Sequence, residues 1–258
     1  MGSSLHVALL QSSLYWEDPG ANREMFEGKI AGLPERIDLV ILPEMFTTGF
    51  TMAPGNIDPC EGPKTLEWMK ELAERGQRAL VGSVAVADGE DHFNRMYFVH
   101  PGGRVDVYDK RHCFTLAGEK EVYRAGREKI IVDYRGFKFC PLICYDLRFP
   151  VWARNVEDYD ALIYVANWPA PRIAAWDTLL RARAIENMAY CIGVNRVGDD
   201  PNGHVYPGHS AVYDMLGHPL AHGKGEGALY AELKRGPLEE TRGKLRFLED
   251  RDSFSLSK

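Results

Sequence analysis

Short apolar segments recur along the chain, and they constrain its fold more than any other feature. These segments are rich in Val, Ile and Tyr and are bounded by Gly, Pro or Asp, a pattern typical of buried β-strands. The expected strands cover residues 6–10, 38–42, 79–86, 94–99, 130–134, 137–143, 161–166, 191–197 and 210–213. Helices are expected over 22–31, 62–75 and 176–190. Pro63 suits a first helical turn, and the apolar residues within 176–190 lie at helical spacing. Helices between strands indicate an α/β fold.

Two pairs of strands are expected to form hairpins, which argues against a purely parallel sheet. The sequence DGEDH separates the strands within residues 79–99, and an RG turn separates those within 130–143. Mixed sheets with helices outside are therefore predicted. The absence of a linker-like or repeated segment indicates a single domain over residues 1–258, with a polar C-terminal tail from about residue 236.

Charge and cysteine content exclude several classes of protein. The 31 Lys and Arg residues are outnumbered by 37 Asp and Glu residues, so a nucleic-acid partner is not expected. No apolar run reaches the roughly 18 residues of a membrane span, and no signal-peptide pattern is present. Five cysteines without a CxxC pair do not suggest a disulfide framework. We therefore expect a cytoplasmic protein without a membrane partner.

Three expected strands end in residues with catalytic potential. VILPE ends in Glu44, VYDKRHCF contains Lys110, and FCPLICYDLRFP contains Cys144. Each has an ordinary interpretation alone: a loop carboxylate, a solvated basic turn, or a buried thiol such as Cys140. Together they supply a base, an oxyanion-stabilising cation and a nucleophile. A strand-to-helix turn also predicts a lowered pKa for Cys144.

The segments LPEMFTTGF, YDKRHCF and CYDLRFP resemble the catalytic segments of the nitrilase superfamily, the carbon–nitrogen hydrolases. YVANWPAPR, LLRARAIEN and NRVG are similar to the bacterial omega-amidase branch, and the likeness extends over roughly residues 5–250. It implies a four-layer α-β-β-α sandwich of two mixed sheets that forms a homodimer or higher homo-oligomer. It also implies Glu44 as general base, Lys110 as catalytic lysine and Cys144 as nucleophile, with no metal or organic cofactor.

The resemblance implies hydrolysis of a small amide through a thioester. Lys110 and the backbone N–H of Tyr145 would stabilise the oxyanion. A second active-site glutamate is expected in the loop after Lys110, where GEKEVYRAG offers Glu119, with Glu121 as a rival.

The expected substrate is a small amide that also carries a carboxylate. Arg148, four residues after Cys144, is placed to bind that carboxylate, although an ion pair with Asp146 is the alternative. Arg172 is a second candidate contact for the carboxylate. Trp168 and either Phe50 or Phe46 are expected to wall the pocket, with aromatic core packing as the alternative for each. In the omega-amidase branch, the substrates are 2-oxoglutaramate and 2-oxosuccinamate.

Other functions share some of these residues. Nitrilases, carbamoylases and other amidases use the same three catalytic residues, and their spacing does not separate them. A papain-like pair of Cys144 with His112 or His209 lacks supporting flanking sequence. A zinc site drawn from Cys140, Cys144, His112 and Cys113 lacks ligand spacing. A non-catalytic binding protein would be expected to have lost one of the three catalytic residues.

Overall fold

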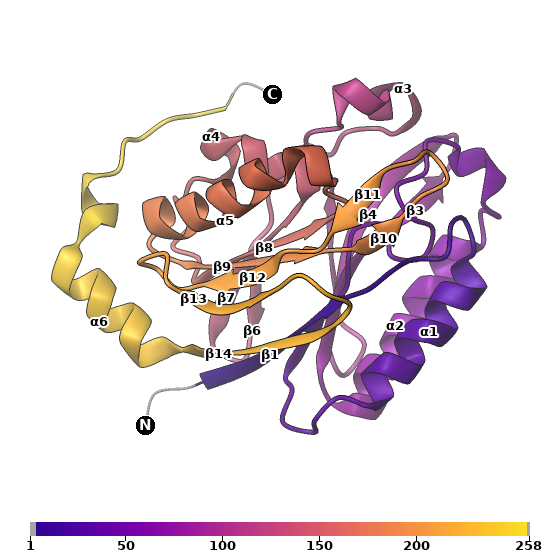
Figure 1. Ribbon diagram of the computed structural model, residues 1–258. Helices are drawn as coiled ribbons and strands as arrows, with labels where there is room; N and C mark the ends of the chain where they lie inside the picture. Colours follow the sequence, from indigo (N-terminus) through magenta and orange to yellow (C-terminus); the bar gives the residue numbers. More distant parts are fainter. Residues whose placement is uncertain (1–3, 257–258) are drawn as a thin grey trace.

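The computed structural model describes residues 4–256, which form two six-stranded mixed sheets with helices on their outer faces (Figure 1). The first sheet has the order β14-β1-β2-β3-β4-β5. Its strands are β1 (Ser4–Gln11), β2 (Leu39–Ile41), β3 (Ala79–Asp88), β4 (Asp91–Val99), β5 (Val105–Asp109) and β14 (Gly227–Lys234). The second sheet has the order β13-β12-β9-β8-β7-β6. Its strands are β6 (Val132–Tyr134), β7 (Phe137–Ile143), β8 (Ala161–Ala166), β9 (Tyr190–Asn195), β12 (Ser210–Tyr213) and β13 (Pro219–Gly223).

The helices and one short hairpin complete the architecture. The α-helices are α1 (Pro19–Ala31), α2 (Glu61–Gly76), α3 (Glu119–Val122), α4 (Pro150–Ala153), α5 (Ile173–Asn187) and α6 (Arg235–Leu245). Helices α1 and α2 lie against the first sheet, and α5 lies over the second (Figure 1). The hairpin is formed by β10 (Val197–Asp199) and β11 (Val205–Pro207). Every helix in the described range is too short or too polar to cross a bilayer.

Strand β1 shows why the apolar runs are nearly continuous. Its residues Leu5, Val7 and Leu9 belong to the core between the two sheets. The alternate residues Ala8 and Leu10 belong to a second core with residues of α1 and α2. Because successive side chains of a strand point to opposite faces, a strand buried on both sides must be apolar at every position. The expected four-layer α-β-β-α sandwich is confirmed.

Each sheet has a parallel centre and antiparallel edges. Strands β1, β2 and β3 are parallel, as are β7, β8 and β9. The predicted hairpins are confirmed: β3 pairs antiparallel with β4, and β6 with β7. This topology places the carboxyl ends of β2, β7 and β8 close to one another, a common position for a binding site.

The C-terminal part differs most from the sequence-based expectation. Strand β14 was not predicted, yet it pairs with β1 over its full length. The segment expected as a polar tail forms α6, although it begins with Gly236 and Pro237 after Arg235. Its Leu238 is fully buried, and Arg242 donates to the Met188 carbonyl at 2.7 Å. Tertiary contacts, which local sequence does not reveal, therefore stabilise this helix.

Candidate active site

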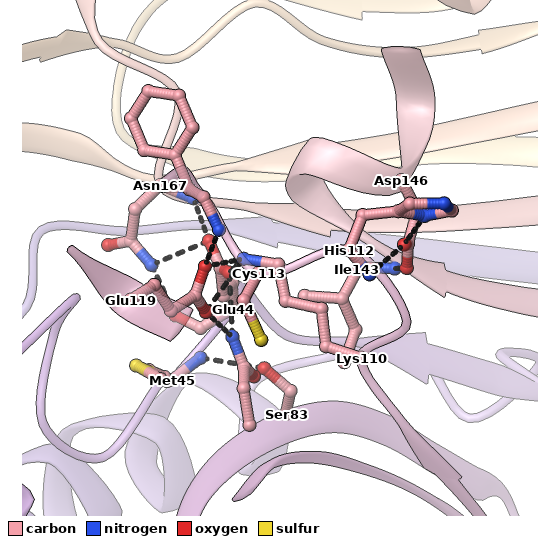
Figure 2. A network of polar contacts seen from close by, with 12 residues as sticks. Glu44, Met45, Ser83, Lys110, His112, Cys113, Glu119, Ile143, Asp146 and Asn167 are labelled. Carbon is pink, nitrogen blue, oxygen red and sulfur yellow. Dashed lines mark hydrogen bonds and ion pairs between the residues drawn. The ribbon is translucent and has the colours of Figure 1, made fainter. Parts of the chain in front are cut away.

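The three residues from separate strand ends meet in the structure. Glu44 follows β2, Lys110 directly follows β5, and Cys144 directly follows β7. The Lys110 ammonium donates a hydrogen bond to Glu44 Oε1 at 2.9 Å (Figure 2). Glu44 is completely buried and Lys110 is 1% exposed, so this ion pair lies away from solvent screening.

Glu119, rather than Glu121, completes the lysine environment. Lys110 Nζ donates to Glu119 Oε1 at 2.9 Å and to Oε2 at 2.8 Å. The backbone N–H of Phe114 also donates to Glu119, which is fully buried. By contrast, the side chain of Glu121 is 72% exposed and lies 3.8 Å from Lys120. The geometry therefore favours Glu119 over Glu121 as the second glutamate of the site.

Two asparagines that the sequence analysis missed hold the Glu44 carboxylate. Asn94, on β4, donates to Glu44 Oε1 at 2.8 Å. Asn167, after β8, donates its backbone N–H to Glu44 Oε2 at 2.8 Å and its side-chain amide to the Glu44 carbonyl at 2.7 Å. The available signal was Asn94 at the start of the expected strand 94–99, since a polar residue that becomes buried needs hydrogen-bond partners.

The cluster of Glu44, Lys110 and Glu119 contains two carboxylates and one ammonium. Burial lowers the pKa of Lys110, but the charges of Glu119 and Glu44 outweigh it, and the pKa lies well above its usual value. Burial also raises the pKa of Glu119, opposed by the charge of Lys110. The lysine is therefore a permanent cation at neutral pH.

Cys144 occupies a strained backbone position beside this cluster. Its φ is 43°, which is uncommon for a residue other than glycine and typical of strained functional sites. Burial raises the pKa of its thiol well above the usual value, and the negative charge of Glu44 adds to this effect. The predicted lowering of the pKa is wrong, because burial beside two carboxylates outweighs any effect of the short following turn. The resting sulfur is therefore a protonated thiol.

Asp146 connects the turn that begins at Cys144 to the segment around Lys110. One of its oxygens accepts from the His112 backbone N–H at 3.0 Å and lies 2.7 Å from His112 Nδ1. The other accepts from the Tyr108 hydroxyl at 2.7 Å and from the Ile143 N–H at 3.0 Å. Figure 2 shows His112, Ile143 and Asp146 together. His112 Nδ1 thus faces Asp146, and the imidazole ring stacks on the ring of Phe149 with their centroids 3.7 Å apart.

The pocket beside Cys144 has a volume of about 280 Å³, and several aromatic side chains line it. The expected residues Phe50, Tyr145, Arg148, Trp168 and Arg172 all line it. The alternative aromatic residue packs elsewhere: Phe46 is fully buried against Phe26 and Trp68. One further wall, which the sequence pattern did not indicate, comes from the hairpin of β10 and β11 and contributes Asp200, Asn202, His204 and Tyr206.

Two arginines give this pocket a positive character. The Arg148 guanidinium lies 5.0 Å from the Trp168 ring centroid, and that of Arg172 lies 5.1 Å from the Phe114 ring centroid. Among residues 4–256, neither forms a salt bridge with a carboxylate. The alternative ion pair of Arg148 with Asp146 is therefore absent from the described part of the chain.

Asp200 does not cancel this positive character by pairing with an arginine. Its oxygens accept hydrogen bonds from the backbone N–H groups of Asn202 and His204 and from the Tyr206 hydroxyl. The pocket lining thus brings together Cys144 and two cations that form no salt bridge within residues 4–256, a setting suited to a small anion.

Comparison with known proteins gives a consistent result. Residues 6–243 match the family model of carbon-nitrogen hydrolase. The chain is 46% identical to omega-amidase YafV of Yersinia enterocolitica, over 98% of this chain and 99% of that protein. It is 34% identical to 2-oxoglutaramate amidase of Bacillus subtilis, over 95% and 96% of the two chains. The structure of XC1258 from Xanthomonas campestris, a CN-hydrolase superfamily protein with an arsenic adduct in its active site, superposes with a TM-score of 0.95 at 41% identity, covering 99% of this chain and 100% of that one.

Proposed function

The chain belongs to the carbon–nitrogen hydrolase family, and on this premise we propose that it is an omega-amidase. Its substrates are 2-oxoglutaramate or 2-oxosuccinamate, and its products are ammonia and 2-oxoglutarate or oxaloacetate. One observation carries the proposal: Cys144 lies between a buried Glu44–Lys110–Glu119 cluster and a pocket whose two arginines form no salt bridge in the described part of the chain. The first part matches amide hydrolysis, and the second matches a carboxylate at the far end of the substrate.

The first half of the reaction transfers the acyl group to sulfur. Glu44 removes the Cys144 proton while the sulfur attacks the amide carbon, because the raised thiol pKa leaves little thiolate at neutral pH. The carbonyl oxygen becomes an oxyanion, stabilised by the Lys110 ammonium and the backbone N–H of Tyr145. Glu44 then protonates the leaving nitrogen, and the carbon–nitrogen bond breaks to release ammonia and a thioester.

The second half regenerates the enzyme. Glu44, again a carboxylate, removes a proton from a water molecule as its oxygen attacks the thioester carbon. The Lys110 ammonium and the backbone N–H of Tyr145 again stabilise the oxyanion. When the carbon–sulfur bond breaks, the proton held by Glu44 returns to sulfur, and the carboxylic acid leaves. The hydrogen bonds from Asn94 and Asn167 support this role, since they fix the orientation of the carboxylate that moves the proton in both halves.

Lys110 is suited to stabilise charge rather than to transfer a proton. Its pKa lies well above the usual value because of Glu119 and Glu44. The hydrogen bonds to Glu119 hold its nitrogen in place before substrate arrives. A preorganised donor of this kind contributes about 10²–10³ in rate.

Substrate selection follows from the arginines. A guanidinium binds a carboxylate through two parallel hydrogen bonds, so Arg148 or Arg172 is suited to the substrate carboxylate. Trp168 and Phe114 contact these guanidinium groups by cation–π geometry and restrict their motion. Nitriles and carbamoyl compounds lacking a suitably placed carboxylate would not use these contacts.

The test is ammonia release from a panel of substrates. The panel contains 2-oxoglutaramate, glutamine, an N-carbamoyl amino acid and an aliphatic nitrile. We expect efficient turnover of the keto amide only, and none by Cys144→Ala. The matched control is Cys113→Ala, which removes a nearby thiol that donates to the Tyr123 carbonyl, and it should remain active. Preferential turnover of the nitrile or the carbamoyl compound would reject the omega-amidase assignment.

We also propose that the protein is a cytoplasmic homodimer. Val151 on α4, Ile185 on α5 and Leu216 in the turn between β12 and β13 are exposed apolar residues, and Gly217, next to Leu216, lies against Ile185. Neighbouring exposed apolar groups favour association. All five cysteines are free thiols, which suits a reducing compartment. Sedimentation of the wild-type protein and Ile185→Arg tests the dimer: a monomeric wild type, or an unchanged dimer in the variant, would contradict this surface.

A further inference from the structure

We propose that Asp177, His209 and His222 bind one divalent transition-metal ion on the outer surface of the second sheet. Asp177 belongs to α5, His209 directly precedes β12, and His222 lies on β13. One potential ligand atom from each residue lies within 4.8 Å of the others. The His209 and His222 rings are 5.4 Å apart in an edge-to-face arrangement. These residues lie outside the pocket lining and play no part in the proposed amidase reaction.

The backbone that carries His209 is held rigidly. His209 has a φ of 63°, and its carbonyl accepts a hydrogen bond from Trp176 Nε1 at 2.8 Å. The preceding Gly208 carbonyl accepts from Asn195 at 2.8 Å. The following Ser210 N–H donates to Gln11 Oε1 at 2.8 Å. A non-glycine residue in this conformation requires such support, and the support fixes where the imidazole leaves the backbone.

The other two ligands also come from regular structure. His222 pairs with Ala211 in the antiparallel ladder of β12 and β13. Asp177 follows the fully buried Trp176 in α5, and its two oxygens lie 3.0 and 2.9 Å from His209 Nδ1. The cluster therefore combines side chains from three elements whose backbones are already placed, which lowers the ordering cost of binding an ion.

The ligand chemistry favours a borderline transition metal over Ca²⁺ or Mg²⁺. Two imidazoles and one carboxylate suit Zn²⁺, Co²⁺ or Ni²⁺, whereas the alkaline-earth ions prefer oxygen ligands. His209 is 14% exposed, Asp177 is 36% exposed, and His222 is also exposed. Water therefore has access to complete a four-coordinate ion. When His209 Nδ1 coordinates, its hydrogen bond to Asp177 is replaced by two bonds to the metal.

The ion would connect α5 to the hairpin of β12 and β13. Such a cross-link stabilises the folded chain, because the three ligands are together only when these elements are packed. Trp176, which lies beside Asp177, is 5.5 Å from the ring of Trp168 in the pocket wall. The role is structural, and the reaction at Cys144 does not require the metal.

The test measures Zn²⁺ binding in competition with a chromophoric chelator, using the full-length wild-type protein, His222→Ala and His218→Ala. His218 is the matched control, because it is an exposed histidine of the same hairpin that pairs with a carboxylate, Asp214, at 3.1 Å. The His218–Asp214 pair lacks the second histidine that the proposed zinc site has. All three proteins keep the same cysteines, so zinc binding to thiols contributes equally to each.

We expect one equivalent of Zn²⁺ to bind to the wild type and to His218→Ala, with affinity about tenfold or more weaker in His222→Ala. Thermal unfolding should rise with Zn²⁺ in the first two proteins and rise less in the third. Without metal, all three should unfold alike, since both substituted side chains are exposed. Equal Zn²⁺ affinity and an equal thermal shift in wild type and His222→Ala would overturn the proposal.

Discussion

Replacing Glu119 with Gln removes one of the two carboxylates that hold Lys110. The native glutamate accepts hydrogen bonds from Lys110 through both of its oxygens and from the Phe114 N–H. A glutamine keeps the shape and one acceptor oxygen, but its amide nitrogen cannot accept from either donor. The change therefore tests whether Lys110 needs both carboxylates.

The expected size of the effect follows from these bonds. A hydrogen bond to a charged group is worth about 1.5–3 kcal/mol. Removing a buried charge recovers some desolvation, which is the main reason that the pKa of Glu119 is raised. We therefore expect the free energy of unfolding to fall by about 2 kcal/mol. A misplaced Lys110 should lower kcat/KM by about 10²–10³, the usual loss of one oxyanion donor.

Urea unfolding and ammonia release from 2-oxoglutaramate measure these two effects. The control is Glu121→Gln, because Glu121 lies two residues away and is exposed. It should change stability by no more than about 0.5 kcal/mol and leave kcat/KM near the wild-type value. A Glu119→Gln enzyme as active and stable as the wild type would refute the reasoning, as would equal losses in the Glu121 variant.

Three further predictions concern binding, ionisation and the supporting network. Arg148→Ala should raise KM about tenfold or more for a carboxylate-bearing amide and barely change it for a neutral amide in steady-state kinetics; equal effects would argue for a structural role. Because burial and Glu44 raise the pKa of Cys144, kcat/KM should show no rise from thiol ionisation between about pH 7 and 9, and a tenfold rise would contradict this. Asp146→Asn keeps one acceptor oxygen and so loses the acceptor either for Tyr108 or for His112. It should destabilise the fold by about 2–4 kcal/mol in urea, whereas an unchanged midpoint would show that the network is dispensable.

The sequence alone revealed the parts of the site that local pattern determines. Glu44, Lys110 and Cys144 each follow a recognisable strand, so their positions at strand ends were predictable. The Arg135–Gly136 turn marked the hairpin of β6 and β7, because both residues adopt a positive φ there. These features depend on a few neighbouring residues. That Glu44, Lys110 and Cys144 form one site was inferred from the family resemblance.

Features that depend on distant contacts were not predictable from the sequence. Asn167 holds Glu44 across 123 positions of the chain, and β14 pairs with β1 at the opposite end of the sequence. The raised pKa of Cys144 depends on burial and on carboxylates from two other segments. The pocket wall of β10 and β11 is a polar hairpin whose role appears only when it packs near Trp168. All four of these features are determined by tertiary packing rather than by local sequence propensity.

The most direct test of the central claim is mass spectrometry of the protein quenched in acid during turnover of 2-oxoglutaramate. We predict an acyl group, added with loss of ammonia, on the peptide that contains Cys144. The peptides with Cys60, Cys113, Cys140 and Cys191 should be unmodified, and Cys144→Ala should show neither adduct nor turnover. Turnover by that variant, or an acyl group on another cysteine in place of Cys144, would contradict the account.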